Sequence, residues 1–206
     1  MVDNMEPLVR LLEISDKSAP GVTPDFMPAH VWKTIILLNE SSLGRKSLSE
    51  KLCLGEGTVR NIVKRLSDEV FITISKTGMR LTKQGQEFYH ELKKYLRGIK
   101  FPFEGLTVER ENYAVLIIDG ACKINFGVEQ RDAALISGAK GATTVINRSG
   151  ELILPGMRHV LEDEHKEFLI NSLEPDDGDA IIIGSDKSQL KAEIGAISSA
   201  LTLYMT

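Results

Sequence analysis

Cationic and amide side chains recur along one short stretch of the chain at spacings that suit the recognition of nucleic acid. Arg60, Asn61 and Lys64 lie close together, and Thr58 and Arg65 flank them. Arg and Asn have the shapes that form bidentate hydrogen bonds with guanine and adenine edges. Lys and Arg also neutralise phosphates, which supplies most of the sequence-independent affinity for DNA.

An apolar stripe on the same stretch predicts the element that positions these side chains. Val59, Ile62, Val63 and Leu66 follow the spacing i, i+3, i+4 and i+7, which is typical of an amphipathic helix. We expect this helix to begin at Thr58 and to bury the stripe. Its opposite face then presents the basic and amide side chains.

A second, shorter helix is predicted just before it. The segment Ser47-Leu48-Ser49-Glu50 has the form of a capping box that opens a helix, and Gly55-Glu56-Gly57 ends that helix. A short helix, a glycine-containing turn and a second helix form the arrangement that docks in a DNA major groove. Arg45 and Lys46, in the loop expected at 41–46, either reach backbone phosphate or form a solvated pair.

A hairpin is predicted after the two helices. Residues 71–75 and 79–82 read as strands, and Lys76-Thr77-Gly78 joins them as a tight turn. Lys76, Arg80 and Lys83 give this hairpin a basic character. The run Gly78-Met-Arg-Leu-Thr-Lys-Gln-Gly85 closes it.

Residues 29–97 as a whole resemble the winged helix-turn-helix family of prokaryotic regulators, in which such a run often forms the second strand of the wing. The resemblance implies that the second helix enters the major groove and that the wing contacts phosphate or the minor groove. The alternative is a protein-interaction or dimerisation module with the same fold. The DNA-binding residues expected on this basis are Arg45, Lys46, Thr58, Arg60, Asn61, Lys64, Arg65, Lys76, Arg80 and Lys83.

The flanks of this domain are also predicted to be helical. A weakly amphipathic helix at 5–14 belongs to an N-terminal arm, residues 1–28, which packs across the next domain or acts as a dimerisation arm. The first helix of the winged domain (29–100) runs from Pro28 to Asn39, with Trp32 in its core. A long helix from Thr82 or Lys83 to Arg97 pairs with a twofold mate or packs on another domain. The boundary is expected at 98–105.

Charge divides the 206-residue chain into two parts. Residues 31–100 contain 14 Lys and Arg against 7 Asp and Glu, whereas residues 101–206 contain 9 against 17. The basic part can meet phosphates, and the acidic part would repel them. The two parts are therefore expected to have different functions.

Composition indicates an ordinary globular protein. Cys53 and Cys122 both lie in apolar contexts and are expected to be buried thiols in a reducing cytosol. The first ten residues lack the basic start and apolar core of a signal peptide, and no apolar run reaches membrane-spanning length. We therefore expect a cytoplasmic protein without a membrane partner.

The second half, residues 105–206, is predicted to be a small α/β sandwich, which makes the whole chain an α+β protein. Apolar runs predict strands at 113–118, 142–146, 151–154 and 179–183, with a shorter one at 123–128. Helices are expected at 129–139, with Ala133, Ala134 and Ile136 facing inward, and at 159–173 and 185–203. No internal repeat is visible.

Polar loops beside these strands are candidates for a ligand site, because ligands bind beyond strand ends in open α/β sheets. The alternative is that the glycines only end helices and turns and that Arg131 pairs locally with Asp132. The candidate ligand-binding residues are Asp119, Gly120, Arg131, Gly138, Lys140, Gly141, Thr143 and Thr144.

Enzyme signatures are few, since the chain lacks the nucleophile elbow, Walker loop and dinucleotide-binding turn. Glu162 and His165 have the spacing of carboxylate metal sites, but only one copy is present. We expect no catalytic residues, no cofactor and no metal, and interpret the acidic segment near 162 as a helix start.

The most consistent interpretation is a homodimeric transcriptional regulator that binds double-stranded DNA and whose second domain senses a small effector or joins two subunits. Its overall pattern resembles archaeal winged-helix regulators with an added C-terminal α/β domain of unassigned function. The alternative is an enzyme that acts on a nucleotide or phosphorylated small molecule and uses the winged helix for regulation or protein interaction.

Overall fold

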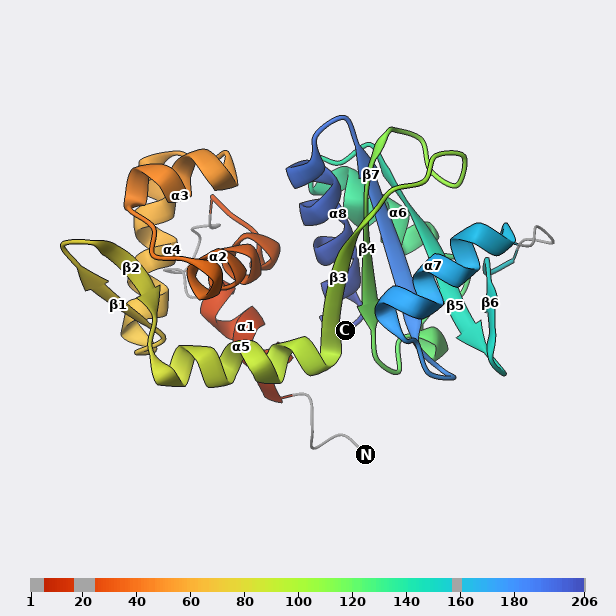
Figure 1. Cartoon of the computed structure of the whole chain (residues 1–206), viewed down its shortest axis with the longest axis horizontal. Coiled ribbons are helices and arrows are strands. Elements are labelled where there is room, and N and C mark those ends of the chain that lie inside the picture. The colour runs from red at the N-terminus through yellow and green to blue at the C-terminus, as the bar shows by residue number, and fades with distance from the viewer. Residues whose placement is uncertain (1–5, 17–24, 157–160, 206) are drawn as a thin grey trace. The chain divides into compact units, whose positions relative to one another are not determined.

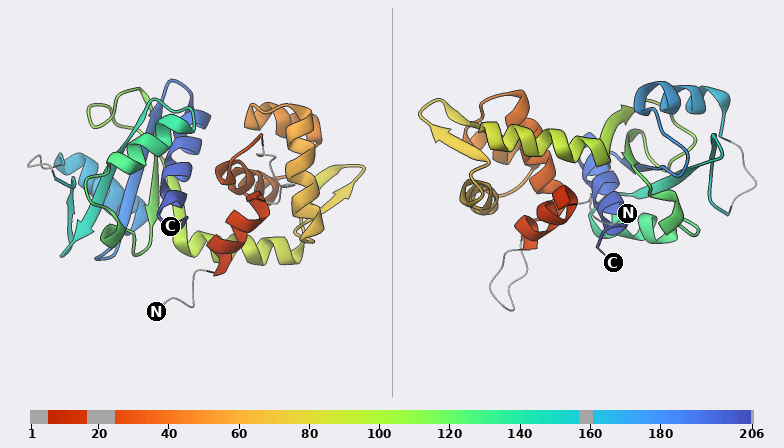
Figure 2. Two further views of the ribbon diagram at one scale, coloured as in Figure 1. Left: turned by 180° about the vertical axis from the view of Figure 1, so that it is seen from behind. Right: turned by 90° about the horizontal axis from the view of Figure 1, so that it is seen from below.

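The computed structural model describes residues 6–16, 25–156 and 161–205. The chain divides into two compact units, Met1–Lys93 and Lys94–Thr206, whose elements are labelled in Figure 1 and seen from two further sides in Figure 2. In the part of the chain described, no helix combines the length and apolar character needed to span a bilayer.

The N-terminal unit contains a helix-turn-helix and a two-stranded hairpin, as the sequence predicts. Its core includes Trp32, Ile35, Leu48 and Ile62, all buried. Trp32 also stacks on Tyr89, with ring centroids 5.6 Å apart. The elements are α1 (Glu6–Asp16), α2 (Pro28–Glu40), α3 (Arg45–Leu52), α4 (Glu56–Asp68), β1 (Ile72–Ser75), β2 (Gly78–Leu81) and α5 (Lys83–Tyr95).

The two central helices begin earlier than the sequence suggested. α3 starts at Arg45 and α4 at Glu56, with Gly44 and Gly55 as their N-caps. Ser47 therefore lies inside α3, so the expected capping box does not form. Charged residues such as Arg, Lys and Glu are good helix formers, which allows each helix to extend back to the preceding glycine.

Helix α1 packs within its own unit, against α2 and α4. Leu8, Leu11 and Ile14 form its buried face, and Leu12 is half-buried. Two roles were considered for the N-terminal segment, namely packing across the winged-helix domain that follows it and dimerisation. These contacts support the first role.

A strand follows α5 directly. Residues 96–101, expected to end the long helix and start a linker, instead form β3 (Leu96–Phe101). β3 pairs antiparallel with β4 (Glu111–Ile117), with Leu96 opposite Ile117 and Phe101 opposite Asn112. Burial of Leu96 and Phe101 on the sheet favours the strand over a further helical turn.

The C-terminal unit is a five-stranded antiparallel sheet in the order β3-β4-β7-β5-β6. Helices α6 and α8 cover one face and α7 covers the other, so the unit is the expected α/β sandwich (Figures 1 and 2). The core on the α7 side includes Phe101, Leu116, Leu169 and Ile181. The remaining elements are the 3-10 helix η1 (Ala121–Lys123), α6 (Val128–Ile136), β5 (Gly141–Arg148), β6 (Glu151–Ile153), α7 (Asp163–Leu173), β7 (Ala180–Asp186) and α8 (Gln189–Thr202).

Several local expectations for this unit are wrong. The strand predicted at 123–128 is absent from these described residues, because Lys123 ends η1, residues 124–127 form a loop and Val128 begins α6. Ile136 is 83% exposed rather than inward-facing. β7 extends to Asp186, which accepts a hydrogen bond from the Ser188 backbone N–H (2.9 Å), so α8 begins four residues later than predicted.

Two further differences concern α7 and the cysteines. α7 begins at Asp163, and the first residues of the predicted helix, 159–160, lie outside the described part of the chain. Cys53 and Cys122 are both free and exposed, so the expectation of buried thiols is wrong. Cys53 is the C-cap of α3 and Cys122 lies within η1, and in both places the apolar neighbours Leu52, Ala121 and Ile124 are buried while the cysteine is not.

Asp179 is a buried carboxylate that joins two turns of the C-terminal unit. It accepts hydrogen bonds from the backbone N–H groups of Asp119 and Asp176, each 2.9 Å long. Burial raises its pKa above the ordinary value of 3.8, although the two hydrogen bonds oppose the shift. At pH values between the unfolded and folded pKa of Asp179, the folded state therefore binds more protons than the unfolded state.

Because the pKa of Asp179 is raised in the folded state, its contribution to stability is largest below about pH 3.8 and falls as pH rises through the folded pKa. The side chain of the Asp179→Asn variant cannot ionise. Its NH2 group, which is a donor, would face one of the two backbone N–H groups that donate to the carboxylate. We expect this variant to be less stable, with a deficit in unfolding free energy that narrows as pH rises above about 3.8. Urea unfolding at several pH values measures this difference, and a deficit that widens with pH would contradict the assignment.

Candidate nucleic-acid interface

Helix α4 is positioned by its apolar face and presents its polar face outward. Val59, Ile62, Val63 and Leu66 are all buried, which confirms the predicted stripe. The left-handed conformation of Cys53, with φ of 50°, ends α3 and turns the chain toward α4. Arg60, Asn61 and Lys64 are exposed on the outer face, as expected.

The wing is a hairpin in which Ser75 pairs with Gly78 and Ile72 pairs with Leu81. The Ser75 hydroxyl donates to the Gly78 carbonyl (3.0 Å) and accepts from the Thr77 backbone N–H (3.2 Å). These bonds hold the tip in a tight turn. Lys76, at the tip, is exposed.

A second set of contacts fixes the base of the wing beside α3. Leu43 and Met79 exchange backbone hydrogen bonds of 3.0 and 2.8 Å, so the segment before α3 forms a bridge to β2. The Ser42 hydroxyl donates to the Thr77 carbonyl at 3.2 Å. The wing is therefore anchored to the helix-turn-helix.

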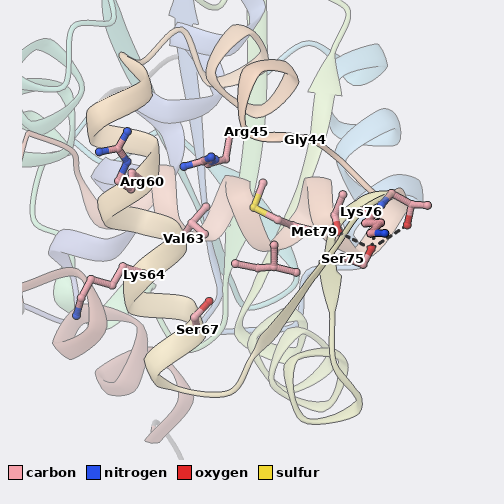
Figure 3. Close-up of a pocket in the computed structure, with 12 residues that line it drawn as sticks. Gly44, Arg45, Arg60, Val63, Lys64, Ser67, Ser75, Lys76 and Met79 are labelled. Atoms are coloured by element: carbon pink, nitrogen blue, oxygen red, sulfur yellow. Dashed lines mark hydrogen bonds between the residues drawn. The ribbon is translucent and has the colours of Figure 1, made fainter.

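A groove of about 770 Å³ lies between α4, the start of α3 and the wing (Figure 3). Four basic residues, Arg45, Arg60, Lys64 and Lys76, contribute to its lining, together with the buried Val63 and Met79. None of the described residues that line it is acidic. A cationic groove with a helix on one side and a hairpin on the other suits a phosphate backbone and an adjacent groove edge.

Ion pairs hold two of the basic side chains only weakly. Lys64 Nζ lies 2.9 Å from the Asp68 carboxylate, and Lys83 Nζ lies 3.9 Å from that of Glu87. Both pairs are exposed, and such pairs contribute little stability because solvent screens them. Either lysine can exchange its carboxylate for a phosphate.

Four of the ten predicted DNA-binding residues line this groove, namely Arg45, Arg60, Lys64 and Lys76. Some of the predicted residues occupy different positions from those expected. Arg45 and Lys46 are exposed in the first turn of α3 rather than in the loop before it. Thr58 is half-buried within α4 rather than at its start. Arg80 is exposed on β2, and Lys83 begins α5.

Arg65 is the exception, because it serves the interior of the unit. Its guanidinium donates to the backbone carbonyls of Ile14 (3.0 Å) and Ser15 at the end of α1. It also lies over the Phe26 ring, 4.7 Å from the centroid. Burial lowers its pKa. These contacts tie α1 to α4 and remove Arg65 from the candidate DNA surface.

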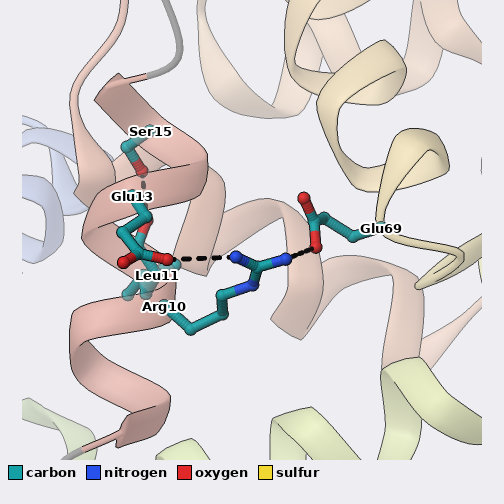
Figure 4. A network of polar contacts seen from close by, with 5 residues as sticks. All are labelled: Arg10, Leu11, Glu13, Ser15 and Glu69. Atoms are coloured by element: carbon teal, nitrogen blue, oxygen red, sulfur yellow. Dashed lines mark hydrogen bonds and ion pairs between the residues drawn. The ribbon is translucent and has the colours of Figure 1, made fainter.

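A neighbouring network strengthens the same junction (Figure 4). Arg10 of α1 pairs with Glu13 at 3.0 Å and with Glu69, which follows α4. The Ser15 hydroxyl donates to the Leu11 carbonyl at 2.7 Å. The end of the candidate recognition helix is therefore held by α1 through two separate arginines, Arg10 and Arg65.

Sequence reasoning missed several uncharged members of the groove. Ser67, Ile74, Ser75 and Thr77 line it beside the basic residues. The period-two alternation of side chains along β1 partly predicts which of its residues line the groove. That prediction requires the buried face of the strand to be known. The position of Ser67 follows only from the packing of α4 against the wing.

The candidate ligand residues of the C-terminal unit do not form a single site. The antiparallel register sets Ile117 opposite Ala180 at one end of the sheet and Gly141 opposite Ser185 at the other. Asp119 and Gly120 therefore lie at the opposite end from Lys140 and Gly141. The expectation drawn from parallel sheets fails because every strand pair is antiparallel.

The structure does bring three of these residues together. Arg131, Thr143 and Thr144 line a pocket of about 160 Å³, whereas Gly138 is exposed at the end of α6. His165 is buried against Phe101 and Phe103, and its Nε2 lies 3.9 Å from the Glu162 carboxylate. The described residues include no cluster of three metal-ligating side chains.

Comparisons with known proteins agree with this division of the chain. Residues 30–96 match a family model described as the CggR N-terminal DNA binding domain. Residues 108–203 match one described as a domain of unknown function, DUF4443. No curated protein matches the chain.

Among solved structures, a hypothetical protein from Pyrococcus horikoshii OT3 is similar over most of its length. The two are 30% identical with a TM-score of 0.72, and the match covers 88% of this chain and 94% of that one. The N-terminal unit is thus a winged helix-turn-helix DNA-binding domain. The chain belongs to the same family as this Pyrococcus horikoshii protein.

Proposed function

We propose that this protein is a transcriptional regulator whose α4 enters the major groove of duplex DNA while the wing contacts the backbone or the minor groove. The observation that carries the proposal is the groove whose described lining contains Arg45, Arg60, Lys64 and Lys76 but no acidic residue. Arg60 and Asn61 are the candidates for base contacts, because both are exposed on α4 and have bidentate geometry.

We further propose that the C-terminal unit acts by binding rather than by catalysis, either as a sensor of a small effector or as the dimerisation surface. The described residues that line its pocket include an arginine and two threonines but no His, Cys, Asp or Glu. A single recognition helix reads few base pairs, so a homodimer on a two-fold site is the expected assembly. A regulator of chromosomal genes works in the cytoplasm, and the Pyrococcus relative supports an archaeal source.

Charge reversal on α4 tests the DNA-binding surface. We expect Arg60→Glu/Lys64→Glu to weaken binding to fragmented genomic DNA and to the gene's own upstream region by at least about tenfold at 0.1 M salt. The slope of log affinity against log salt should fall by about 1, because the phosphate contact of Lys64 is lost and each such contact contributes about 0.9. Fluorescence anisotropy at several salt concentrations measures both quantities, and titration to saturation gives the number of chains per site.

Arg148→Glu/Lys187→Glu is the matched control, since it changes net charge equally at exposed positions of the C-terminal unit. Equal losses in the two double variants would show that only net charge matters. Retained binding after reversal on α4 would exclude this face as the DNA surface and favour the protein-interaction alternative.

A further inference from the structure

A small pocket in the C-terminal unit has features that no part of the DNA-binding proposal uses. It lies between the start of α6, strand β5 and the segment that follows β6. Its volume is about 160 Å³, below the roughly 300–1,000 Å³ of sites for drug-sized ligands. Its residues are Phe126, Gly127, Val128, Arg131, Ala142, Thr143, Thr144, Leu154 and Pro155.

Thr144 contributes a buried hydroxyl without a partner among the described residues. The residue is 5% exposed, and its Oγ1 makes no hydrogen bond there. Its neighbour Thr143 differs, because its hydroxyl donates to the Leu106 carbonyl at 2.7 Å. A buried unpaired hydroxyl is costly in a folded protein, so a bound polar group that pairs with Thr144 would remove that cost.

The N-terminus of α6 lies directly beside this hydroxyl. Gly127, with φ of 76°, is the N-cap and supplies no capping side chain. A Cβ added there would come within 2.8 Å of both Cβ and Oγ1 of Thr144. The Arg131 N–H makes the bond to the Gly127 carbonyl (3.1 Å), so the N–H groups of residues 128–130 precede the intrahelical ladder and favour an anion.

Arg131 provides the charge of the pocket. Its guanidinium is paired with the adjacent Asp132 at 3.1 and 3.3 Å. Both side chains are about half exposed, so this pair is worth little and can open toward a ligand. Apolar side chains complete the walls, among them Phe126, which is 71% exposed.

We propose that this pocket binds a compact carboxylate with a short apolar body. The carboxylate would accept hydrogen bonds from the N-terminal turn of α6, Thr144 and Arg131, and the apolar body would contact Phe126, Val128 and Leu154. The assignment of this pocket as the effector site of the regulator rests on the proposed function. Binding itself can be measured without DNA, so failure of either proposal is distinguishable.

The test is an NMR titration of the full-length 15N-labelled protein with butyrate. Butyramide has the same apolar body without the charge, and inorganic phosphate supplies charge without that body. We expect saturable shifts of the Val128, Glu129 and Gln130 amide signals with butyrate, and at least tenfold weaker binding of the other two. Absence of saturation with butyrate, or equal binding of butyramide or phosphate, would overturn the proposal.

Two variants separate ligand contact from structural effects. Thr144→Val keeps the shape of the side chain and removes the unpaired hydroxyl, so we expect a Tm raised by about 2–4 °C together with lost butyrate binding. Arg131→Gln should weaken binding at least tenfold, whereas Arg148→Gln, an exposed residue at the far end of β5, should not. Butyrate binding retained in both pocket variants would overturn the assignment.

Discussion

Gly85→Ala is expected to destabilise the winged-helix unit by at least about 3 kcal/mol. A Cβ at this position of α5 would lie 2.0 Å from the backbone oxygen of Phe71 and 2.9 Å from its carbonyl carbon. The obstacle is backbone, so no side-chain rotation relieves it, and overpacking of this kind costs about 1–3 kcal/mol or more.

The cost rises because Phe71 is held by the residues next to Gly85. Its carbonyl accepts from the Thr82 N–H at 2.9 Å. The Thr82 hydroxyl accepts from the Gly85 N–H (3.0 Å) and donates to the Val70 carbonyl (2.7 Å). Moving Phe71 away from the new methyl group would break the bonds that join the wing to α5. This geometry explains why threonine and glycine stand at these two positions of the run that closes the wing.

Chemical denaturation followed by circular dichroism measures the effect, with hydrogen exchange of peptides covering residues 71–95 to locate it. Gly57→Ala is the control, because it makes the same change inside α4 where a Cβ would meet nothing within 4 Å. That variant should be as stable as wild type or slightly more so, since alanine is the better helix former. Comparable stability of Gly85→Ala and Gly57→Ala would refute the steric argument.

The local pattern of the sequence was enough to predict the recognition helix and wing. The apolar residues of α4 recur at the spacing of an α-helix, and glycine and polar residues mark the turn between β1 and β2. The first residues of α3 and α4 were harder to predict, because Gly44 and Gly55 look like helix breakers in the sequence but act as N-caps in the structure. Nothing local distinguishes these two uses of glycine.

Roles that depend on distant segments could not be predicted. Arg65 lies in sequence among residues of the exposed face, yet its partners are carbonyls of Ile14 and Ser15 some fifty residues away. β3 forms because β4 offers an edge for pairing, which the residues of β3 do not reveal. The ligand candidates were identified individually. The antiparallel register separates Asp119 from Lys140, and the packing of α6 against β5 brings Arg131 and Thr144 to the same pocket.

The second large effect is expected for Gly184→Ala in the C-terminal unit. Gly184 belongs to β7, the central strand of the sheet, on which α8 packs. A Cβ there would lie 2.2 Å from the carbonyl oxygen of Ala192 and 2.6 Å from the backbone nitrogen of Ala196. The helix lies so close that α8 would have to move off the strand, and we expect a loss of at least about 3 kcal/mol.

A second substitution distinguishes a backbone clash from a side-chain clash. The Cβ of Ala196 would lie 3.0 Å from the added methyl group, so Ala196→Gly removes that contact but leaves the two backbone atoms in place. We therefore expect Gly184→Ala/Ala196→Gly to remain at least as unstable as Gly184→Ala in urea unfolding. Recovery of wild-type stability in the double variant would show that side chains, rather than the backbone of α8, set the approach of helix to strand.

Because β7 also pairs with β5, whose Thr144 lines the small pocket, displacement of α8 should in addition loosen the candidate effector site. Butyrate binding would then be lost together with the fold of this unit.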